Sequence, residues 1–180
     1  MQKMLIGFLS FLCLSFPLAA ADAGEYEHSL AAEKMTVQWR LDETMIHLKL
    51  TAPTQGWVGI GFGPEDAMKG ADFILGAVKK GKVKIVDHYG DKKRGHSSDE
   101  KLGGKNHVQN PQGSEVDGTT SIWFSLPLGS DEQWDKSIEV NSMYPIMLAY
   151  GSGADSFRRG HAWRGSYEVN FTSGESKKVK

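Results

Sequence analysis

Two residues of this sequence, one methionine and one histidine, have side chains that bind transition metals in many proteins. Met68 lies in a polar turn at residues 64–72, beside Lys69 and Gly70, where a role in a hydrophobic core is not obvious. Its soft thioether sulfur is able to bind copper(I) or to serve as an axial ligand of haem iron. An ordinary loop methionine is the alternative that the turn alone leaves open.

The histidine lies in a second unusual segment, residues 149–165. This segment groups a histidine with two aromatic residues and three arginines: His161, Phe157, Trp163, Arg158, Arg159 and Arg164. Imidazole is a common nitrogen ligand of iron, and guanidinium groups pair bidentately with carboxylates such as haem propionates. A hydrogen-bonded loop histidine beside solvated arginines is the alternative.

Alternate glycines mark a third segment, residues 57–63. If this segment is a strand, Gly59, Gly61 and Gly63 share one face, opposite Val58, Ile60 and Phe62. Glycine weakens a strand, so such a bare face indicates that another backbone or a flat ligand packs closely against it. A tightly packed sheet without a ligand remains the alternative. A phosphate loop is not favoured, because no strand-to-helix context and no Gly-Lys-Ser/Thr follow.

The first 21 residues have the layout of a secretory signal peptide. Lys3 precedes an apolar stretch of about a dozen residues, and small residues end it at Ala21. The stretch is shorter than the ~20 residues that cross a bilayer, and no later segment approaches that length. We therefore expect an exported protein, periplasmic or extracellular, with no transmembrane segment in a mature chain of residues 22–180.

Composition excludes several kinds of chemistry for that mature chain. The sole cysteine, Cys13, lies inside the leader, which excludes disulfides, thiolate metal sites and covalent haem attachment. The 20 basic and 22 acidic side chains that remain give a net charge of −2, which does not favour a nucleic-acid partner. Nucleophilic hydrolysis is not favoured, since Gly151-Ser152-Gly153 lacks the strand-to-helix elbow.

The elements that position these residues are predicted to be short strands. Apolar and polar residues alternate over 37–41 and 46–50, which predicts a hairpin that turns at Asp42-Glu43. The other predicted strands are 57–63, 72–78, 83–89, 119–126, 145–150 and 166–171. This pattern predicts an all-β fold, an antiparallel two-sheet β-sandwich of immunoglobulin-like outline in a single domain. Ser130–Lys136 is the best short helix, and 94–118 is expected to be a long polar surface loop in which His96 and His107 are solvated.

The order of these landmarks resembles the DOMON domain family. The resemblance rests on Trp39 and the hairpin, Gly56-Trp57-Val58-Gly59-Ile60-Gly61-Phe62, Met68, Gly70-Ala71-Asp72-Phe73-Ile74-Leu75-Gly76, Val86-Asp87-His88-Tyr89, Ala149-Tyr150-Gly151, His161 and Arg164-Gly165. It covers about residues 35–171, and the chain is similar to the haem-binding members, such as the cytochrome domain of cellobiose dehydrogenase. The 94–118 segment does not follow the family pattern.

The resemblance implies one noncovalent haem b held between Met68 and His161. It implies an exported b-type cytochrome that carries electrons rather than an enzyme, with a redox partner protein or a membrane cytochrome as its unidentified partner. Gly59 and Gly61 would admit one face of the porphyrin. The expected apolar walls are Phe62, Tyr150 and Trp163, and the expected propionate partners are Arg158, Arg159 and Arg164.

Two other functions are weighed against electron transfer. A haem-free module that binds sugars or a small hydrophobic ligand would suit a sandwich with five tryptophans, although Trp39 and Trp57 are expected in the core. A copper protein would need a third ligand besides Met68 and His161, and the sequence does not supply one.

Overall fold

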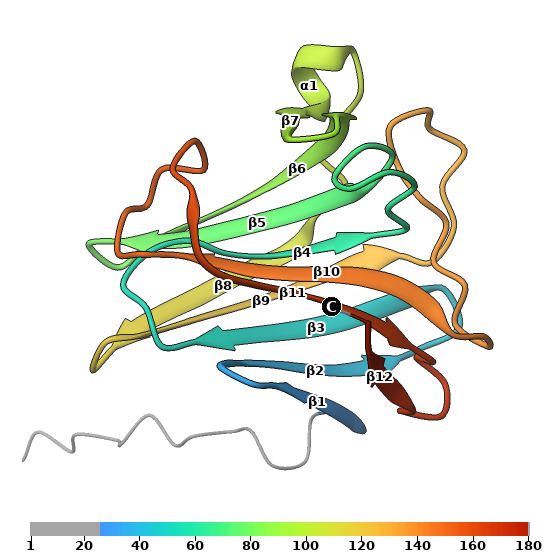
Figure 1. Cartoon of the computed structure of the whole chain (residues 1–180), viewed down its shortest axis with the longest axis horizontal. Helices are drawn as coiled ribbons and strands as arrows, with labels where there is room; N and C mark the ends of the chain where they lie inside the picture. Colours follow the sequence, from blue (N-terminus) through green and yellow to red (C-terminus); the bar gives the residue numbers. More distant parts are fainter. Residues whose placement is uncertain (1–25, 180) are drawn as a thin grey trace, which may run out of the picture.

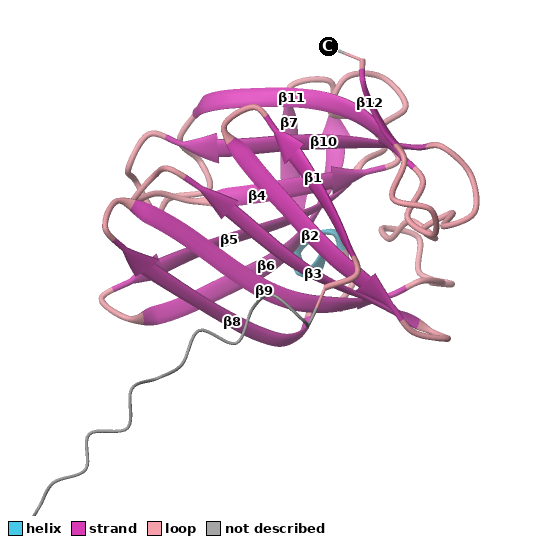
Figure 2. Cartoon of the chain, turned by 90° about the horizontal axis from the view of Figure 1, so that it is seen from below, coloured by secondary structure: helices cyan, strands magenta, loops and turns pink. Residues whose placement is uncertain are grey.

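The computed structural model describes residues 26–179 as two antiparallel β-sheets packed face to face (Figure 1). The signal peptide expected at residues 1–21 lies outside the described residues. Short loops join most of the strands, and Figure 2 shows that strands make up nearly all of the regular structure. The prediction of an all-β sandwich in one domain is therefore confirmed.

The smaller sheet has five strands in the order β1-β2-β3-β9-β8. Its bounds are β1 His28–Ala32, β2 Met35–Leu41, β3 Met45–Ala52, β8 Gln109–Val116 and β9 Thr119–Pro127. The predicted hairpin is β2 and β3, in register from Thr36↔Thr51 to Leu41↔Ile46. Its turn is closed by the Asp42 carboxylate, which accepts hydrogen bonds from the backbone N–H groups of Thr44 and Met45.

The larger sheet has seven strands in the order β12-β11-β10-β4-β5-β6-β7. Its bounds are β4 Val58–Phe62, β5 Asp72–Lys79, β6 Lys82–Lys92, β7 Gly95–Ser98, β10 Tyr144–Gly151, β11 His161–Val169 and β12 Ser176–Lys178. Strand β10 crosses over from the far end of the chain to pair with β4. This pairing brings the segment that follows β10 to the sheet that carries the alternate glycines.

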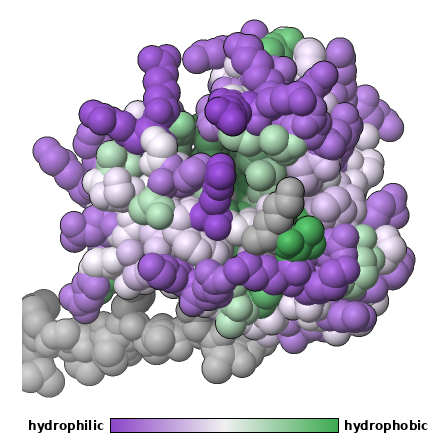
Figure 3. Space-filling view, viewed as in Figure 1, coloured by the Kyte–Doolittle hydropathy of each residue, from purple (hydrophilic) through white to green (hydrophobic). Residues whose placement is uncertain are grey.

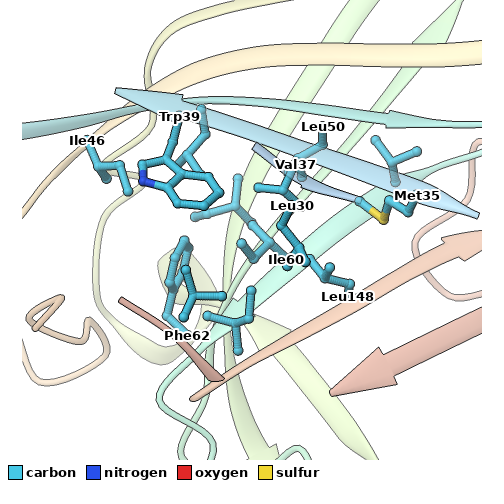
Figure 4. Close-up of a cluster of buried hydrophobic side chains, with 14 of the residues drawn as sticks. Leu30, Met35, Val37, Trp39, Ile46, Leu50, Ile60, Phe62 and Leu148 are labelled. Atoms are coloured by element: carbon cyan, nitrogen blue, oxygen red, sulfur yellow. The ribbon is translucent and has the colours of Figure 1, made fainter. Parts of the chain in front are cut away.

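The main hydrophobic core lies between the two sheets (Figure 4). Trp39 and Leu50 reach it from the smaller sheet, and Ile60, Phe62 and Leu148 reach it from the larger one. Trp39 is fully buried, and its indole Nε1 donates a hydrogen bond of 2.8 Å to the backbone carbonyl of Phe171. Burial of large apolar side chains at about 25 cal/mol per Å² holds the sheets together.

Several predicted elements differ from the structure. Residues 130–136 form turns rather than a helix, and the one helix among residues 26–179 is α1, Asp99–Leu102. The expected loop 94–118 contains β7, α1 and β8, because its polar residues pair at sheet edges where alternation is weak. Strand β11 begins at His161 instead of Ser166. No helix of the described residues is long and apolar enough to cross a membrane.

Candidate functional site

A pocket of about 420 Å³ lies on the outer face of the larger sheet, the face turned away from the main core. Figure 3 shows a hollow in the surface of the molecule, with hydrophobic surface inside it and hydrophilic side chains around it. Strands β4, β5 and β10 form its floor, and its walls come from the Met68 turn, β6, β7 and the 152–160 loop. The volume is in the range of small-molecule binding sites.

The floor owes its depth to glycines on β4. Gly59 and Gly61 line the pocket, as the alternation predicts. A Cβ atom would lie 2.5 Å from Leu75 Cδ2 at position 59 and 2.4 Å from Phe73 Cε1 at position 61. Side chains of β5 therefore lie over the glycines and form part of the floor. Gly63 does not belong to this face, because it follows β4 at a positive φ of 60°.

Met68 lines the pocket from a tight turn that its backbone fixes on both sides. The N–H of Met68 donates to the carbonyl of Lys93, and the carbonyl of Met68 accepts from the N–H of Ala71, each at 3.3 Å. An ion pair of 2.8 Å between Lys93 Nζ and Asp66 Oδ2 joins the turn to the end of β6. The half-buried side chain is thus positioned by backbone contacts beside β5 and β6, and it packs against the hydrophobic cluster that includes Phe73 and Leu75.

His161 lines the same pocket from the first residue of β11. A bulge there leaves Gly151 opposite His161 and Tyr150 opposite Trp163. Gly151 is needed because a Cβ at this position would lie 2.4 Å from the indole Nε1 of Trp57. The structure therefore brings the two sequence-predicted metal ligands to one pocket.

The rim of the pocket carries a one-sided charge. Five basic residues line it, and none of the described lining residues is an aspartate or a glutamate. These basic residues are Arg94, Lys101, Arg158, Arg159 and Arg164. All five are exposed, so their charges are directed to solvent or to an anionic ligand at the mouth. The three arginines expected at the site line the pocket, and Arg94 and Lys101 line it as well.

Two further histidines that the sequence did not single out for this site also line the pocket. His88 Nδ1 on β6 and His96 Nδ1 on β7 are 2.7 Å apart, so one ring donates a hydrogen bond to the other. Burial lowers the pKa of His88 to about 4, with the charges of His96 and Lys101 adding to the effect. Burial also lowers the pKa of His96. The pair is neutral at pH 7 and offers imidazole nitrogens to a ligand.

The three expected aromatic walls lie elsewhere. Phe62 is fully buried in the main core, 6.3 Å from the ring of Phe171. Tyr150 stacks on Trp163 at 5.9 Å on the core side, and Trp163 Nε1 donates to Glu33 Oε2. Because alternate residues of a strand face opposite sides, these side chains point away from the pocket. The apolar lining instead includes Trp57, Phe73, Leu75, Met147 and Phe157.

The expectation that His96 and His107 are solvated loop residues is wrong for both. His96 bonds to His88, as described above. His107 is half-buried, with Nδ1 2.9 Å from Asp135 Oδ2 and Nε2 3.2 Å from Glu132 Oε2. His107 lies outside the pocket, next to a second, much smaller cavity.

The comparisons with known proteins agree with this architecture. The sequence profile of the DOMON domain matches residues 31–151, a range that includes Met68 and ends before His161. The fold is similar to the cytochrome b domain of pyranose dehydrogenase from Coprinopsis cinerea, with a TM-score of 0.61, 12% identity and 78% of each chain covered.

A second solved structure has the same fold. The cytochrome domain of Myriococcum thermophilum cellobiose dehydrogenase aligns with a TM-score of 0.57 and 13% identity, over 78% of this chain and 79% of that chain. Identities this low show a shared fold alone. The profile match covers more than half of the chain, and this chain belongs to the DOMON domain family.

Proposed function

We propose that this protein is an exported b-type cytochrome domain that carries single electrons, with haem b held noncovalently between Met68 and His161. One observation carries the proposal: a thioether, an imidazole, an apolar floor and a rim with five cations and no carboxylate converge on one pocket. A porphyrin has the matching chemistry, with an apolar ring, a metal that accepts sulfur and nitrogen, and two anionic propionates.

The residues of the pocket fit this group. Gly59 and Gly61 leave the floor flat enough for a planar ring, and Phe73 and Leu75 give that floor an apolar surface. Trp57 is 6% exposed and lines the pocket with its aromatic ring. The arginines at the mouth would pair with propionates, which would hold the ring with its edge toward solvent.

The ligand set limits the chemistry. Bound haem iron supplies reversible one-electron chemistry. With Met68 and His161 both coordinated, no open position would remain for oxygen or substrate, which favours electron transfer over catalysis at the metal. As a ligand, the thioether of Met68 would stabilise the ferrous state and raise the potential relative to ligation by two imidazoles. The apolar floor would keep water from the metal, which would favour the state of lower charge.

Export and the partner belong to the same proposal. The leader at residues 1–21 supports a periplasmic or extracellular location. The similar solved structures are cytochrome domains of dehydrogenases, which supports a redox partner protein or a membrane cytochrome as the partner here. The cationic rim favours a partner with an acidic surface.

The absorption spectrum of the purified protein tests the cofactor. Protein exported from a host with adequate haem supply should be red, with the sharp reduced-state bands of six-coordinate low-spin iron. Acid-acetone should extract all of the colour, because the mature chain has no cysteine to hold the porphyrin covalently. A colourless protein that also fails to take up added haem would favour the haem-free binding module.

Substitutions test the ligands. His161→Ala should abolish or greatly weaken haem retention, because it removes the nitrogen donor. Met68→His should retain haem and lower its potential, because imidazole replaces sulfur. His47→Ala is the matched control, since His47 lies on the smaller sheet and bonds to Asp42 and Ser125.

The histidine pair makes this test sharper. His96 lines the pocket, so His96→Ala is not a neutral control, and it reports instead on the alternative nitrogen ligand. Our assignment predicts that low-spin iron survives in His96→Ala and is lost in His161→Ala. The opposite result would assign the nitrogen ligand to the pair of His88 and His96.

A further inference from the structure

Behind the pocket, on the core side of the larger sheet, lies a group of buried carboxylates. Asp72 on β5 is 6% exposed and Asp87 on β6 is 3% exposed. Their chain neighbours Phe73 and His88 line the pocket, so alternation turns the two aspartates to the opposite face. Such burial is costly for a carboxylate without a compensating positive charge.

A small cavity of about 10 Å³ lies among these side chains. This is close to the space that one water molecule or one ion needs. The cavity is lined by Asp72, Asp87 and Asp135, and also by His107. In each of the three aspartates Oδ1 is buried and, when all three carboxylates are ionised, has no hydrogen-bond partner among the described residues. A protonated Asp72 would donate a hydrogen bond to Asp87, so either a proton or a cation is needed to satisfy these oxygens.

The second oxygens of two aspartates are already held by the backbone. Asp87 Oδ2 accepts the N–H of His107 at 3.0 Å, and Asp72 Oδ2 accepts the N–H of Lys136 at 3.4 Å. These bonds leave the Oδ1 atoms free. The lysine nearest in sequence to this group does not neutralise them, because Lys136 Nζ pairs with Glu65 at 2.6 Å.

The two ring nitrogens of His107 have different neighbours: Nδ1 is near Asp135 and Nε2 is near Glu132. Its Nε2 lies 3.2 Å from Glu132 Oε2, so that carboxylate is next to the ring nitrogen that points away from the cavity aspartates. Its Nδ1 lies 2.9 Å from Asp135 Oδ2, yet the two atoms are not aligned as a hydrogen bond. Metal-bound histidines are usually oriented by a carboxylate on their other nitrogen, as Glu132 would do here.

We propose that Asp87, Asp135 and His107 bind one oxygen-preferring divalent cation, such as Ca²⁺ or Mn²⁺, in this cavity, with Asp72 as a further carboxylate beside them. One ligand atom from each of Asp87, His107 and Asp135 lies within 4.8 Å of the other two, as the ligands of a single ion must. Three carboxylates and one imidazole favour a hard cation over the thiol-preferring metals.

Protons are the competing way to satisfy these carboxylates. Burial raises the pKa of Asp72 well above its usual range, with the charge of Asp87 adding to the effect. Burial also raises the pKa of Asp87 to about 6. At pH 7.5 protons would leave Asp87 largely ionised, whereas a divalent cation would offset two of the carboxylate charges at once. Only the cation explanation predicts that a chelator changes the stability.

The cation would join four parts of the chain that lie far apart in sequence. Asp72 belongs to β5, Asp87 to β6, His107 to the segment before β8 and Asp135 to the loop after β9. We expect the ion to act as a structural staple behind the floor of the larger pocket, because its ligands alternate with Phe73 and His88 on the same two strands.

Thermal unfolding and native mass spectrometry test the site. The purified mature protein is treated with EDTA, dialysed at pH 7.5 and melted with and without CaCl₂, MnCl₂, MgCl₂ or ZnCl₂. We expect one Ca²⁺ or Mn²⁺ per chain by native mass spectrometry. We also expect a rise of about 5–10 °C in melting temperature when the cation exceeds its dissociation constant a hundredfold.

Matched variants locate the effect. Asp87→Asn and Asp135→Asn should each abolish the cation-dependent rise, whereas Asp131→Asn, on an exposed residue of the same loop, should keep it. If an Asn variant does not fold, the parental protein still decides the question by its bound mass and its response to EDTA. A parental protein that binds none of the four cations and melts at the same temperature after EDTA would overturn the proposal in favour of protonated carboxyls.

Discussion

Gly90→Ala should loosen the turn that carries Met68. Gly90 is buried on β6 and makes two hydrogen bonds to the turn. Its N–H donates to the carbonyl of Ala71 at 2.8 Å, and its carbonyl accepts the N–H of Gly70 at 2.9 Å. A Cβ atom at this position would lie 1.7 Å from the carbonyl oxygen of Met68. Real Cβ atoms essentially never come within 3.0 Å of a heavy atom outside their own residue and its two chain neighbours, so the turn and the strand must separate by more than 1 Å.

The cost follows from the contacts that this separation breaks. The two hydrogen bonds contribute about 0.5–1.5 kcal/mol each, and overpacking against rigid backbone costs about 1–3 kcal/mol. We expect the free energy of unfolding to fall by roughly 2–4 kcal/mol. For a chain of this size the melting temperature would fall by roughly 4–16 °C.

Urea unfolding of the haem-free protein at pH 7.5 measures the loss. Gly129→Ala is the matched control, because a Cβ there meets nothing within 4 Å, and its stability should change by less than about 0.5 kcal/mol. In haem-loaded Gly90→Ala, displacement of Met68 should add high-spin iron to the spectrum. Equal stabilities of parent and Gly90→Ala would refute the close contact and the positioning of Met68 derived from it.

The remaining predictions concern charge. Burial lowers the pKa of His96 below its unfolded value of 6.5. The unfolded chain therefore binds more protons than the folded protein at low pH. The free energy of unfolding should fall as the pH drops below about 6.5, by up to ~1.4 kcal/mol per pH unit. His96→Gln should flatten this dependence in urea titrations at pH 4–7, and an unchanged slope would assign the acid lability to other groups. Replacing Arg158 and Arg159 together by Gln should change the bimolecular rate with a charged electron acceptor, and the difference should shrink at high salt. The control is the double replacement of Lys34 and Arg40 by Gln on the side of the smaller sheet. An unchanged rate for the Arg158 and Arg159 variant, with its spectrum and potential intact, would place the electron exit elsewhere.

Much of the fold was predictable because strand signals are local. The β2–β3 hairpin has strict alternation and an Asp42 turn, and both appear within a window of a dozen residues. Strand β8 has no such signal, since it is a polar edge strand that contains Pro111 and Gly113. It forms because β9 offers a free edge, which only the tertiary structure supplies.

The candidate site was predictable in residue type but only partly in position. Gly59 and Gly61 follow from alternation, and the same alternation places Phe62 on the core side, so its assignment to the pocket wall neglected a local signal. His88 could have been found in the same way, because it alternates with Asp87 on a predicted strand. His96 could not, because its segment carries no strand pattern.

The sequence by itself determined the β-class, the shared face of Gly59 and Gly61, and the presence of a soft sulfur and an imidazole in two segments far apart in the chain. Only the tertiary structure decided that these segments meet at one pocket, because β10 lies between β4 and β11 in the larger sheet. It also decided that Asp135 and His107 approach the aspartates of β5 and β6. Periodicity is a property of neighbours along the chain, whereas strand order depends on the burial of both sheet faces together, and no local pattern records that.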